Sequence, residues 1–318
     1  MSLLKFKIAV PATTMIAGEH AVVYQGGAIA CALNTFMHFS WTTTESQAIK
    51  LVSNLGHVVY DLKTKSLSSQ EEKWRYFKLI LDDLSQYHSL NGGVLQIHSE
   101  FSSEHGLGSS SAFVVGMLKV MNKLYQFAKD NLALLRIALS ITRKFSPLAS
   151  GTDIVACIYD GVIYANLRQN IIEKINFDEK KVTLAYCGYK TPTPVVLRRV
   201  EQNLAKEAKL HKALNAISHH VDLIKDAMIL NQHSDLEVLM FEHHRYLKEL
   251  GVVDKNLEDI YKSMSQDSCL CGAKVSGSGL GDSVISFGQT QGLHTQQLPG
   301  SFQKTYDIYN SQVYSLEY

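Results

Sequence analysis

The chain has 318 residues, of which 46% are hydrophobic and 19% are charged, and its formal net charge is +1. This composition is typical of a globular protein with a substantial core and excludes an intrinsically disordered chain. The near-neutral charge provides no basic field for nucleic acid, so local groups must hold any anionic ligand. The five cysteines are odd in number and form no C-x-x-C pair. They indicate free thiols in a reducing compartment and a cytoplasmic protein.

The N-terminal region is expected to contain neither a targeting signal nor a membrane span. Lys5 and Lys7 interrupt an apolar stretch that a secretory signal would keep uncharged. Residues 21–44 include no Asp, Glu, Lys or Arg, but glycines, Asn34 and a run of threonines interrupt them. A membrane span needs about 20 predominantly apolar residues. Buried strands joined by turns explain this segment better, and no membrane partner is predicted.

The first half of the chain is dominated by strand signals. Alternating or continuous apolar runs between turn residues predict strands, and apolar stripes at helical spacing predict helices. In chain order these are strands at 4–10, 28–43 (as one or two strands), 49–52 and 58–62, a helix at 71–87, a strand at 93–98, and helices at 109–127 and 130–144.

The second half is dominated by helix signals. In chain order it has strands at 161–166 and 182–187, about three helices between 195 and 267, and strands at 273–275 and 284–287 around a glycine-rich turn. Strands followed by helices indicate an α+β fold with two lobes. No linker marks the boundary, so we set it near residue 185. This gives an N-terminal domain at 1–185 and a C-terminal domain at 186–318.

The strongest chemical signal is the string GLGSSS at Gly106–Ser111, between a predicted strand and a predicted helix. Glycines let the backbone approach an anion closely. A serine-rich helix start then points free N–H groups and the positive end of the helix dipole at that anion. No lysine follows the glycines, so this is not the Walker A P-loop. The alternative interpretation is an ordinary glycine turn with serine N-caps.

Three other segments combine glycine with polar residues. In Gly18–Tyr24, Glu19 and His20 stand in an apolar run, so they either satisfy each other or face a cavity. In Ser150–Asp153, a serine or threonine is expected to cap a helix whose first turn holds an aspartate, and the alternative is that this carboxylate points into a cleft. Four glycines within Gly272–Gly281 exceed what a hairpin needs, which indicates close approach to a ligand or to another loop.

Taken in chain order, from Gly18–Tyr24 through Gly106–Ser111 and Ser150–Asp153 to Gly272–Gly281, the four segments resemble the motifs of the GHMP kinase family. The resemblance spans most of the chain and implies a two-lobed α+β fold with the active site between the lobes. It also implies phosphorylation of a hydroxyl on a small-molecule substrate, with ATP and Mg²⁺. Gly18–Tyr24 (GEHAVVY) is most similar to members that phosphorylate mevalonate, whereas Ser276–Asp282 resembles members that act on phosphomevalonate as much. A homodimer is left open.

The resemblance implies a role for each candidate residue. Asp153 would be the catalytic base or orienting carboxylate, and the Ser110 hydroxyl would bind the metal. The residues expected to bind ATP are Gly106, Leu107, Gly108, Ser109, Ser110 and Ser111. The residues expected on the substrate side are Thr13, Glu19, His20, Lys190, Thr191, Gly277, Ser278 and Gly279.

Three departures from the family pattern bear on catalysis. Thr13 stands where the family usually has a lysine, so the lysine expected to face Asp153 is missing. Thr142 stands where relatives that phosphorylate mevalonate have a magnesium-binding glutamate, and the nearest carboxylates by sequence are then Glu104 and Asp153. Ser102 and Glu104 replace residues common in the phosphate loop. A nucleotide-binding regulator without turnover is therefore the competing hypothesis from another class.

The distribution of basic residues favours mevalonate over its 5-phosphate. A phosphate group usually needs a cluster of Arg or Lys to hold it. Residues 11–24 contain neither, and few basic residues lie near a motif, Lys190, Arg143 and Lys144 among them. The sequence therefore predicts phosphorylation of mevalonate to 5-phosphomevalonate, in isoprenoid precursor biosynthesis.

The histidine pairs His219–His220 and His243–His244 lie on predicted helices. Adjacent side chains on a helix diverge by about 100°, which makes each pair a poor bidentate metal site. We expect these histidines to be solvated or to cap helices.

Overall fold

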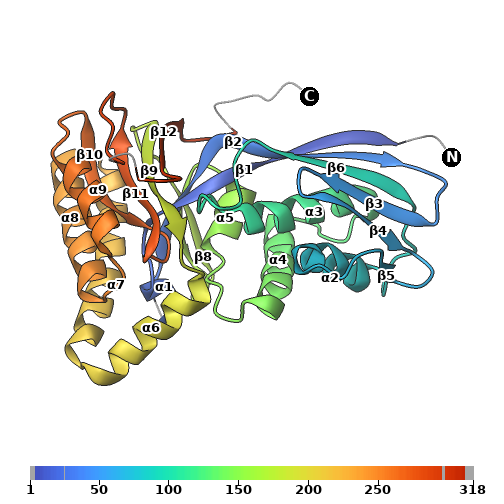
Figure 1. Cartoon of the computed structure of the whole chain (residues 1–318), viewed down its shortest axis with the longest axis horizontal. Helices are drawn as coiled ribbons and strands as arrows, with labels where there is room; N and C mark the ends of the chain where they lie inside the picture. Colours follow the sequence, from blue (N-terminus) through green and yellow to red (C-terminus); the bar gives the residue numbers. More distant parts are fainter. Residues whose placement is uncertain (1–3, 25, 296–297, 312–318) are drawn as a thin grey trace.

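The computed structural model describes residues 4–24, 26–295 and 298–311. In Figure 1 the N-terminal half of the chain, drawn in blue to green, builds one lobe of an elongated molecule, and the yellow to red half builds the other. The first lobe is rich in strands and the second in helices, which confirms the predicted two-lobed α+β fold. No helix in the described part of the chain is long and apolar enough to cross a membrane.

The N-terminal lobe is built on a sheet of eight strands, counted over the described residues. They are β1 (Lys5–Ala17), β2 (Ala28–Thr43), β3 (Ala48–Ser53), β4 (Gly56–Asp61), β5 (Ser66–Leu67), β6 (Gly93–Ser99), β7 (Val162–Asn166) and β8 (Ile171–Ile175). Their order is β5-β4-β3-β6-β2-β7-β8, and β1 pairs with β2. Strand β2 pairs with β1 along most of its length and with β6 and β7 at its two ends. It is mostly buried, which fits its lack of Asp, Glu, Lys and Arg.

Helices cover this sheet and carry the loops of interest. They are the 3₁₀ helix Glu72–Trp74, α2 (Arg75–Leu84), α3 (Ser109–Tyr125), α4 (Asn131–Phe145) and α5 (Thr152–Tyr159). Helices α3 and α5 pack against β1 and β2. Asp130 caps α4, because its carboxylate accepts a hydrogen bond of 2.7 Å from the N–H of Ala133. Because α3 and α5 pack against β1 and β2, the starts of these two helices are fixed on the core of the lobe.

The C-terminal lobe is built on a smaller sheet. Its strands are β9 (Lys181–Lys190), β10 (Leu270–Ser276), β11 (Gly281–Gly288) and β12 (Phe302–Asp307), in the order β10-β11-β9-β12. Its helices are α6 (Thr193–Lys206), α7 (Lys209–Ile229), α8 (His233–Glu249) and α9 (Lys255–Ser265). Helices α8 and α9 pack against β10, and α7 contacts the short helix α1 (Ala21–Tyr24) that follows β1.

Several predicted elements differ from the observed ones. Strand β1 continues to Ala17 instead of ending near residue 10, and four helices, not about three, occupy the described region between Thr193 and Ser265. Strands β5, β8 and β12 were not predicted, because β5 has only two residues, β8 has only five, and β12 is a short edge strand rich in polar residues. The boundary predicted at residue 185 falls inside β9, and the division into two domains stays a prediction.

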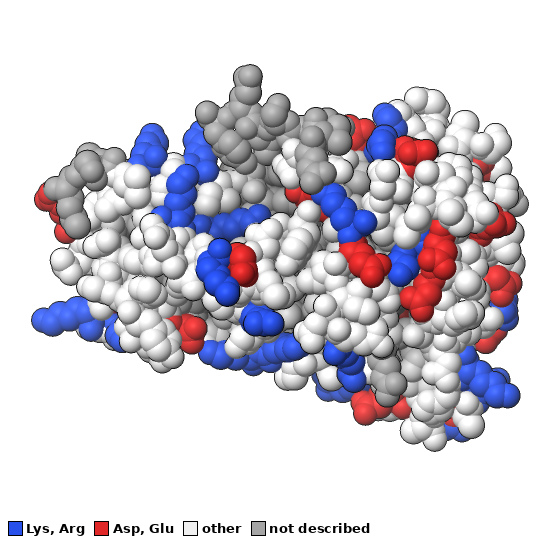
Figure 2. All heavy atoms as spheres, turned by 180° about the vertical axis from the view of Figure 1, so that it is seen from behind, with Lys and Arg blue, Asp and Glu red and all other residues white. Residues whose placement is uncertain are grey.

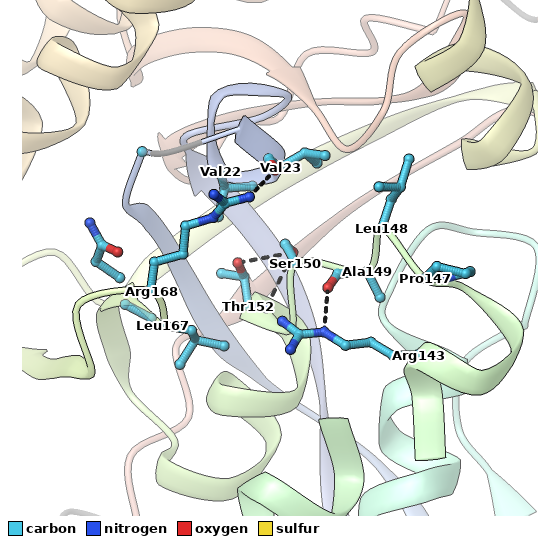
Figure 3. Close-up of a pocket in the computed structure, with 13 residues that line it drawn as sticks. Val22, Val23, Arg143, Pro147, Leu148, Ala149, Ser150, Thr152, Leu167 and Arg168 are labelled. Carbon is cyan, nitrogen blue, oxygen red and sulfur yellow. Dashed lines mark hydrogen bonds between the residues drawn. The ribbon is translucent and has the colours of Figure 1, made fainter. Parts of the chain in front are cut away.

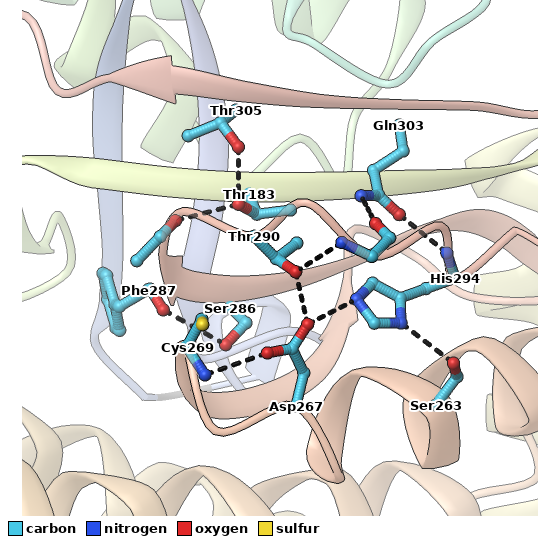
Figure 4. Close-up of polar contacts among 12 residues, drawn as sticks. Thr183, Ser263, Asp267, Cys269, Ser286, Phe287, Thr290, His294, Gln303 and Thr305 are labelled. Carbon is cyan, nitrogen blue, oxygen red and sulfur yellow. Dashed lines mark hydrogen bonds and ion pairs between the residues drawn. The ribbon is translucent and has the colours of Figure 1, made fainter.

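The loop between β11 and β12 is fixed by a polar cluster at the end of α9 (Figure 4). Asp267 accepts hydrogen bonds from the Thr290 hydroxyl and from the Cys269 N–H. His294 Nε2 lies 3.1 Å from the Asp267 carboxylate, and its Nδ1 lies 2.9 Å from Ser263 Oγ. These contacts attach the segment from Thr290 to His294 to the end of α9.

Charged side chains are scattered over the face of the molecule that Figure 2 shows. On the face shown in Figure 2, basic and acidic side chains are interspersed between large uncharged areas. Such a surface agrees with the formal net charge of +1. Because charges of both signs are interspersed on this face, a strong electrostatic potential for an anionic ligand is expected from groups that converge in a cavity.

Candidate active site

A cavity of about 490 Å³ lies where the two lobes meet. The start of α3, the segment from α4 to α5, the end of β9, the start of α6 and the loop between β10 and β11 all contribute to it. The predicted residues that line it are Glu19, His20, Gly106, Ser110, Ser111, Asp153, Lys190, Gly277 and Ser278. The other predicted residues, Thr13, Leu107, Gly108, Ser109, Thr191 and Gly279, are not part of its lining.

The glycine-serine string forms the loop before α3 and its first turn. Gly106 and Gly108 both have positive φ, at 73° and 66°, which glycine adopts without strain. Gly108 is the N-cap residue and has no side chain to cap the helix, so the serine N-cap expected in the alternative interpretation is absent. The N–H groups of the first turn have no partners within the helix. Ser110 and Ser111 of this turn line the cavity, so these N–H groups are available to an anion there.

Replacing Gly108 by alanine is expected to lower kcat/KM for ATP by roughly 10²-fold, as small misplacements at reacting groups do. The added Cβ would lie 2.1 Å from Thr13 Oγ1, and the positive φ strains any L side chain. A coupled ADP-release assay measures the effect. Gly56→Ala is the matched control, because Gly56 also has positive φ but meets only Trp74 at 4.0 Å. A Gly108→Ala protein that binds and uses ATP like the unchanged chain would show that this loop does not hold the phosphates.

Asp153 lies in the first turn of α5, partly buried in the cavity wall. Its carboxylate Oδ1 accepts a hydrogen bond of 3.0 Å from the Thr13 hydroxyl. Burial raises the pKa of Asp153 above its ordinary value, although the Thr13 hydrogen bond and the Lys190 ammonium oppose this. The sequence prediction of a Ser or Thr cap was wrong. The N-cap is Gly151 with φ 85°, whose left-handed backbone starts the helix without a side-chain cap.

Lys190 and Asp282 form an ion pair that also lines the cavity. Lys190 is the last residue of β9, and its Nζ lies 3.0 Å from Asp282 Oδ2. Asp282 is buried, and burial raises its pKa, Lys190 lowers it, and the nearby Asp153 raises it further. The sequence placed Asp282 only at the end of the segment Ser276–Asp282, without a role of its own. Its charge in a loop of glycines was the signal that could have identified it.

Glu19 belongs to a buried charged cluster between the lobes. It forms an ion pair with Lys274 of β10, and its Oε2 lies 3.0 Å from His243 Nε2 on α8. Burial would raise the pKa of Glu19, but the Lys274 ammonium and the His243 ring outweigh it and lower the pKa to about 2. His20 does not pair with Glu19. Its Nε2 instead lies 2.9 Å from the carbonyl oxygen of Ser278.

The expectation of solvated or capping roles was wrong for His243 and His244, which are both buried. Helical periodicity places them on α8 but does not say which face meets the sheet. The His244 ring stacks on Tyr261 with centroids 3.6 Å apart, and its Nδ1 accepts a long hydrogen bond from the Val275 N–H. Burial lowers the pKa of His244 to about 4, although Glu258 opposes this.

This burial predicts a specific loss of stability in acid. The unfolded chain binds a proton on His244 near pH 6.5, whereas the folded chain binds it only near pH 4. The contribution of His244 to stability is therefore constant above the higher value and falls as the pH decreases between the two, by up to about 1.4 kcal/mol per pH unit. Urea unfolding at pH 7 and pH 5 measures the slope of stability against pH. His244→Gln should reduce this slope and His219→Gln, at an exposed position, should not; equal slopes in all three proteins would contradict the assignment.

The cavity holds more basic side chains than the sequence indicated, because Arg75 and Arg198 line it together with Lys190. Thr142 also lines it, and its buried hydroxyl has no hydrogen-bond partner among the described residues. Arg143 instead lines a neighbouring cavity of about 420 Å³ together with Arg168 (Figure 3). Each of these two arginines donates a hydrogen bond to a backbone carbonyl, of Ala149 and Val23 respectively.

Comparison with known proteins identifies the family. The family model described as GHMP kinases N terminal domain matches residues 75–161, and the one described as GHMP kinases C terminal matches residues 213–293. Together these matches cover more than half of the chain. The chain belongs to the GHMP kinase family and is a phosphotransferase that uses a small-molecule substrate.

Similar proteins agree with this assignment. Mevalonate kinase of Saccharolobus solfataricus is 27% identical over 87% of this chain and 88% of its own length. The structure of Methanococcus jannaschii mevalonate kinase matches with a TM-score of 0.79 and 22% identity, over 96% of this chain and 99% of that one. Phosphomevalonate kinase of Streptococcus pneumoniae, solved with phosphomevalonate and AMPPNP, matches with a TM-score of 0.74 and 17% identity, over 94% and 99%.

Proposed function

We propose that the chain transfers the γ-phosphoryl group of ATP to the primary hydroxyl of mevalonate, giving 5-phosphomevalonate for isoprenoid precursor biosynthesis. The observation that carries this proposal is the meeting of an anion-binding helix start, a carboxylate and an ammonium group around one cavity. The curated relative and the M. jannaschii structure, both named mevalonate kinase, support the choice of substrate. All residues proposed for the reaction lie in one chain, so a homodimer is not required.

Each group has a distinct part in the proposed reaction. The first turn of α3 holds the ATP phosphates through its free N–H groups, with Gly106–Ser111 wrapped around them. The substrate hydroxyl oxygen attacks the γ-phosphorus while the bond from that phosphorus to the β–γ bridging oxygen breaks. Asp153 accepts the hydroxyl proton, for which its raised pKa suits it. The protein mainly positions the reactants and stabilises developing charge, as in other phosphoryl transfers.

The residues of the cavity fit a magnesium ion. Mg²⁺ takes oxygen ligands, commonly one or two carboxylates with phosphate oxygens and water. Ser110 and Asp153 both line the cavity and would hold the ion, and no hydrogen bond engages the Ser110 hydroxyl in the described part of the chain. No group of three or more His, Cys, Asp or Glu side chains there forms a metal site, so ATP must supply further ligands. When bound, the ion neutralises charge on the phosphates.

One observation favours 5-phosphomevalonate as a second candidate substrate. The prediction of mevalonate depended on a scarcity of basic residues, yet Arg75 and Arg198 line the cavity. Arg75 is engaged, because it pairs with Glu72 and lies over the rings of Tyr76 and Phe145. Arg198 donates only to the Pro194 carbonyl among the described residues and is the better candidate for a substrate phosphate.

Paired kcat/KM values for the two substrates decide between them. We expect a preference of tenfold or more for mevalonate, which corresponds to about 1.4 kcal/mol of transition-state binding. Arg198→Ala should then leave kcat/KM for mevalonate within a few-fold, as should Arg199→Ala, its exposed neighbour. A tenfold preference for the 5-phosphate, abolished by Arg198→Ala alone, would overturn the substrate assignment. Absence of ADP release with any acceptor would indicate a regulator without turnover.

A further inference from the structure

The Lys190 ammonium lies where the end of β9, the loop before α3 and the turn before β11 meet. Lys190 ends β9, and 31% of its side chain is exposed, so its ammonium remains open to a ligand. Its partner Asp282 has a side chain only 3% exposed. We propose that Lys190 is a catalytic residue that contacts the transferring phosphoryl group, and that Asp282 is a positioning residue that holds it there. This inference rests on the proposed kinase function.

The first support is the contact with the phosphate loop. A Cβ added to Gly106 would lie 2.0 Å from Asp282 Oδ1 and 3.3 Å from Lys190 Nζ. The ion pair therefore packs directly against the backbone of the loop expected to hold the phosphates. A Cβ on Gly277 would lie 2.3 Å from Asp282 Oδ2, so glycines on both sides make room for this carboxylate.

The second support is the backbone of Asp282. Its φ of 81° is rare for a residue with a side chain, and such conformations persist where the surrounding structure holds them. The neighbouring Leu280 and Gly281 also have positive φ, at 53° and 98°. This turn directs the carboxylate back toward β9 and away from solvent. A lysine has a long flexible stem, so a fixed carboxylate restricts where its ammonium can lie.

The third support is the charge around Asp153. The hydroxyl of Thr13 contacts Asp153, but a hydroxyl supplies no charge. Lys190 acts electrostatically on both Asp153 and Asp282, and lowers the pKa of each against the effect of burial. A phosphoryl group in transfer spreads negative charge over its oxygens, and a fixed cation stabilises that charge. Lys190 would supply from β9 the cation that Thr13 of β1 cannot.

The test compares Lys190→Met with Lys190→Arg and with Lys181→Met, a control at the exposed start of the same strand. ADP release is measured with whichever acceptor the unchanged chain phosphorylates fastest, so a wrong choice of mevalonate does not affect the result. We expect Lys190→Met to lower kcat by roughly 10²–10³-fold, the range seen when one stabilising donor is removed. Lys190→Arg should recover at least tenfold of this, and Lys181→Met should stay near normal.

A further readout separates catalysis from structure. Asp282→Asn should lower kcat by about tenfold and should change the acceptor KM in the same direction as Lys190→Met does. Its melting temperature should shift no further than that of Lys181→Met. A Lys190→Met protein with normal kcat and only a raised acceptor KM would overturn the proposal, because Lys190 would then bind the substrate carboxylate.

Discussion

Asp153→Asn is expected to lower kcat by roughly 10²–10⁴-fold, the usual contribution of a positioned base, while ATP binding stays close to that of the unchanged chain. Asparagine keeps the shape of the side chain and can still accept the hydrogen bond from Thr13. It cannot take up the proton of the substrate hydroxyl. Initial rates of ADP release and an ATP titration monitored by fluorescence or calorimetry measure the two quantities separately.

Asp235→Asn is the matched control, because Asp235 is exposed on α8, away from the cavity. It should retain normal turnover. Both variants should melt near the temperature of the unchanged chain, which excludes a folding defect as the cause of any loss. A folded Asp153→Asn protein with near-normal turnover would remove Asp153 from the mechanism.

Lys274→Met should lower the free energy of unfolding by roughly 3–5 kcal/mol, the range for breaking one partner of a buried ion pair. The side chains of Lys274 and Glu19 are 0% and 1% exposed, so the Glu19 carboxylate would lose its ammonium without gaining water. His243 alone would remain as its partner. Urea unfolding at pH 7 measures the change.

The double variant Glu19→Gln/Lys274→Met tests the reason for this loss. Removing both charges leaves no uncompensated ion, so it should recover a large part of the lost stability. Lys78→Met is the surface control, because its i,i+4 pair with Asp82 is partly exposed and should contribute less than about 1 kcal/mol. A double variant no more stable than Lys274→Met would show that packing of the methylene chain, and not charge, causes the effect.

The sequence predicted those features that depend on local pattern. Glycines at 106 and 108 and the serines after them predicted a helix start open to an anion, and the structure has that form. The form of this helix start depends on backbone preferences of a few adjacent residues, which the sequence states directly. The resemblance of the four motifs to those of GHMP kinases implied that their segments meet, and Asp153 does line the cavity with Gly106 and Ser110.

The remaining features depend on contacts between distant residues. Glu19 meets His243 and Lys274, which are 224 and 255 residues away in sequence. No periodicity shows that α8 turns His243 toward the sheet or that Lys274 on β10 points inward. Lys190 and Asp282 meet for the same reason, across the pairing of β9 with β11. The partner of a buried charge can be identified only when the pairing register of the strands is known.

Three helices, α3, α5 and α6, begin at the same cavity, where Ser110, Asp153 and Thr193 of their first turns line it. Each start carries the equivalent of about half a positive charge from its aligned peptide groups. A chain whose formal net charge is only +1 thus has an electropositive centre made of peptide dipoles as well as ions. Because these dipoles are fixed in the backbone, histidine titration and changes to surface lysines leave them intact. Attraction of a polyanionic nucleotide should therefore be short-ranged and largely independent of the overall charge of the protein.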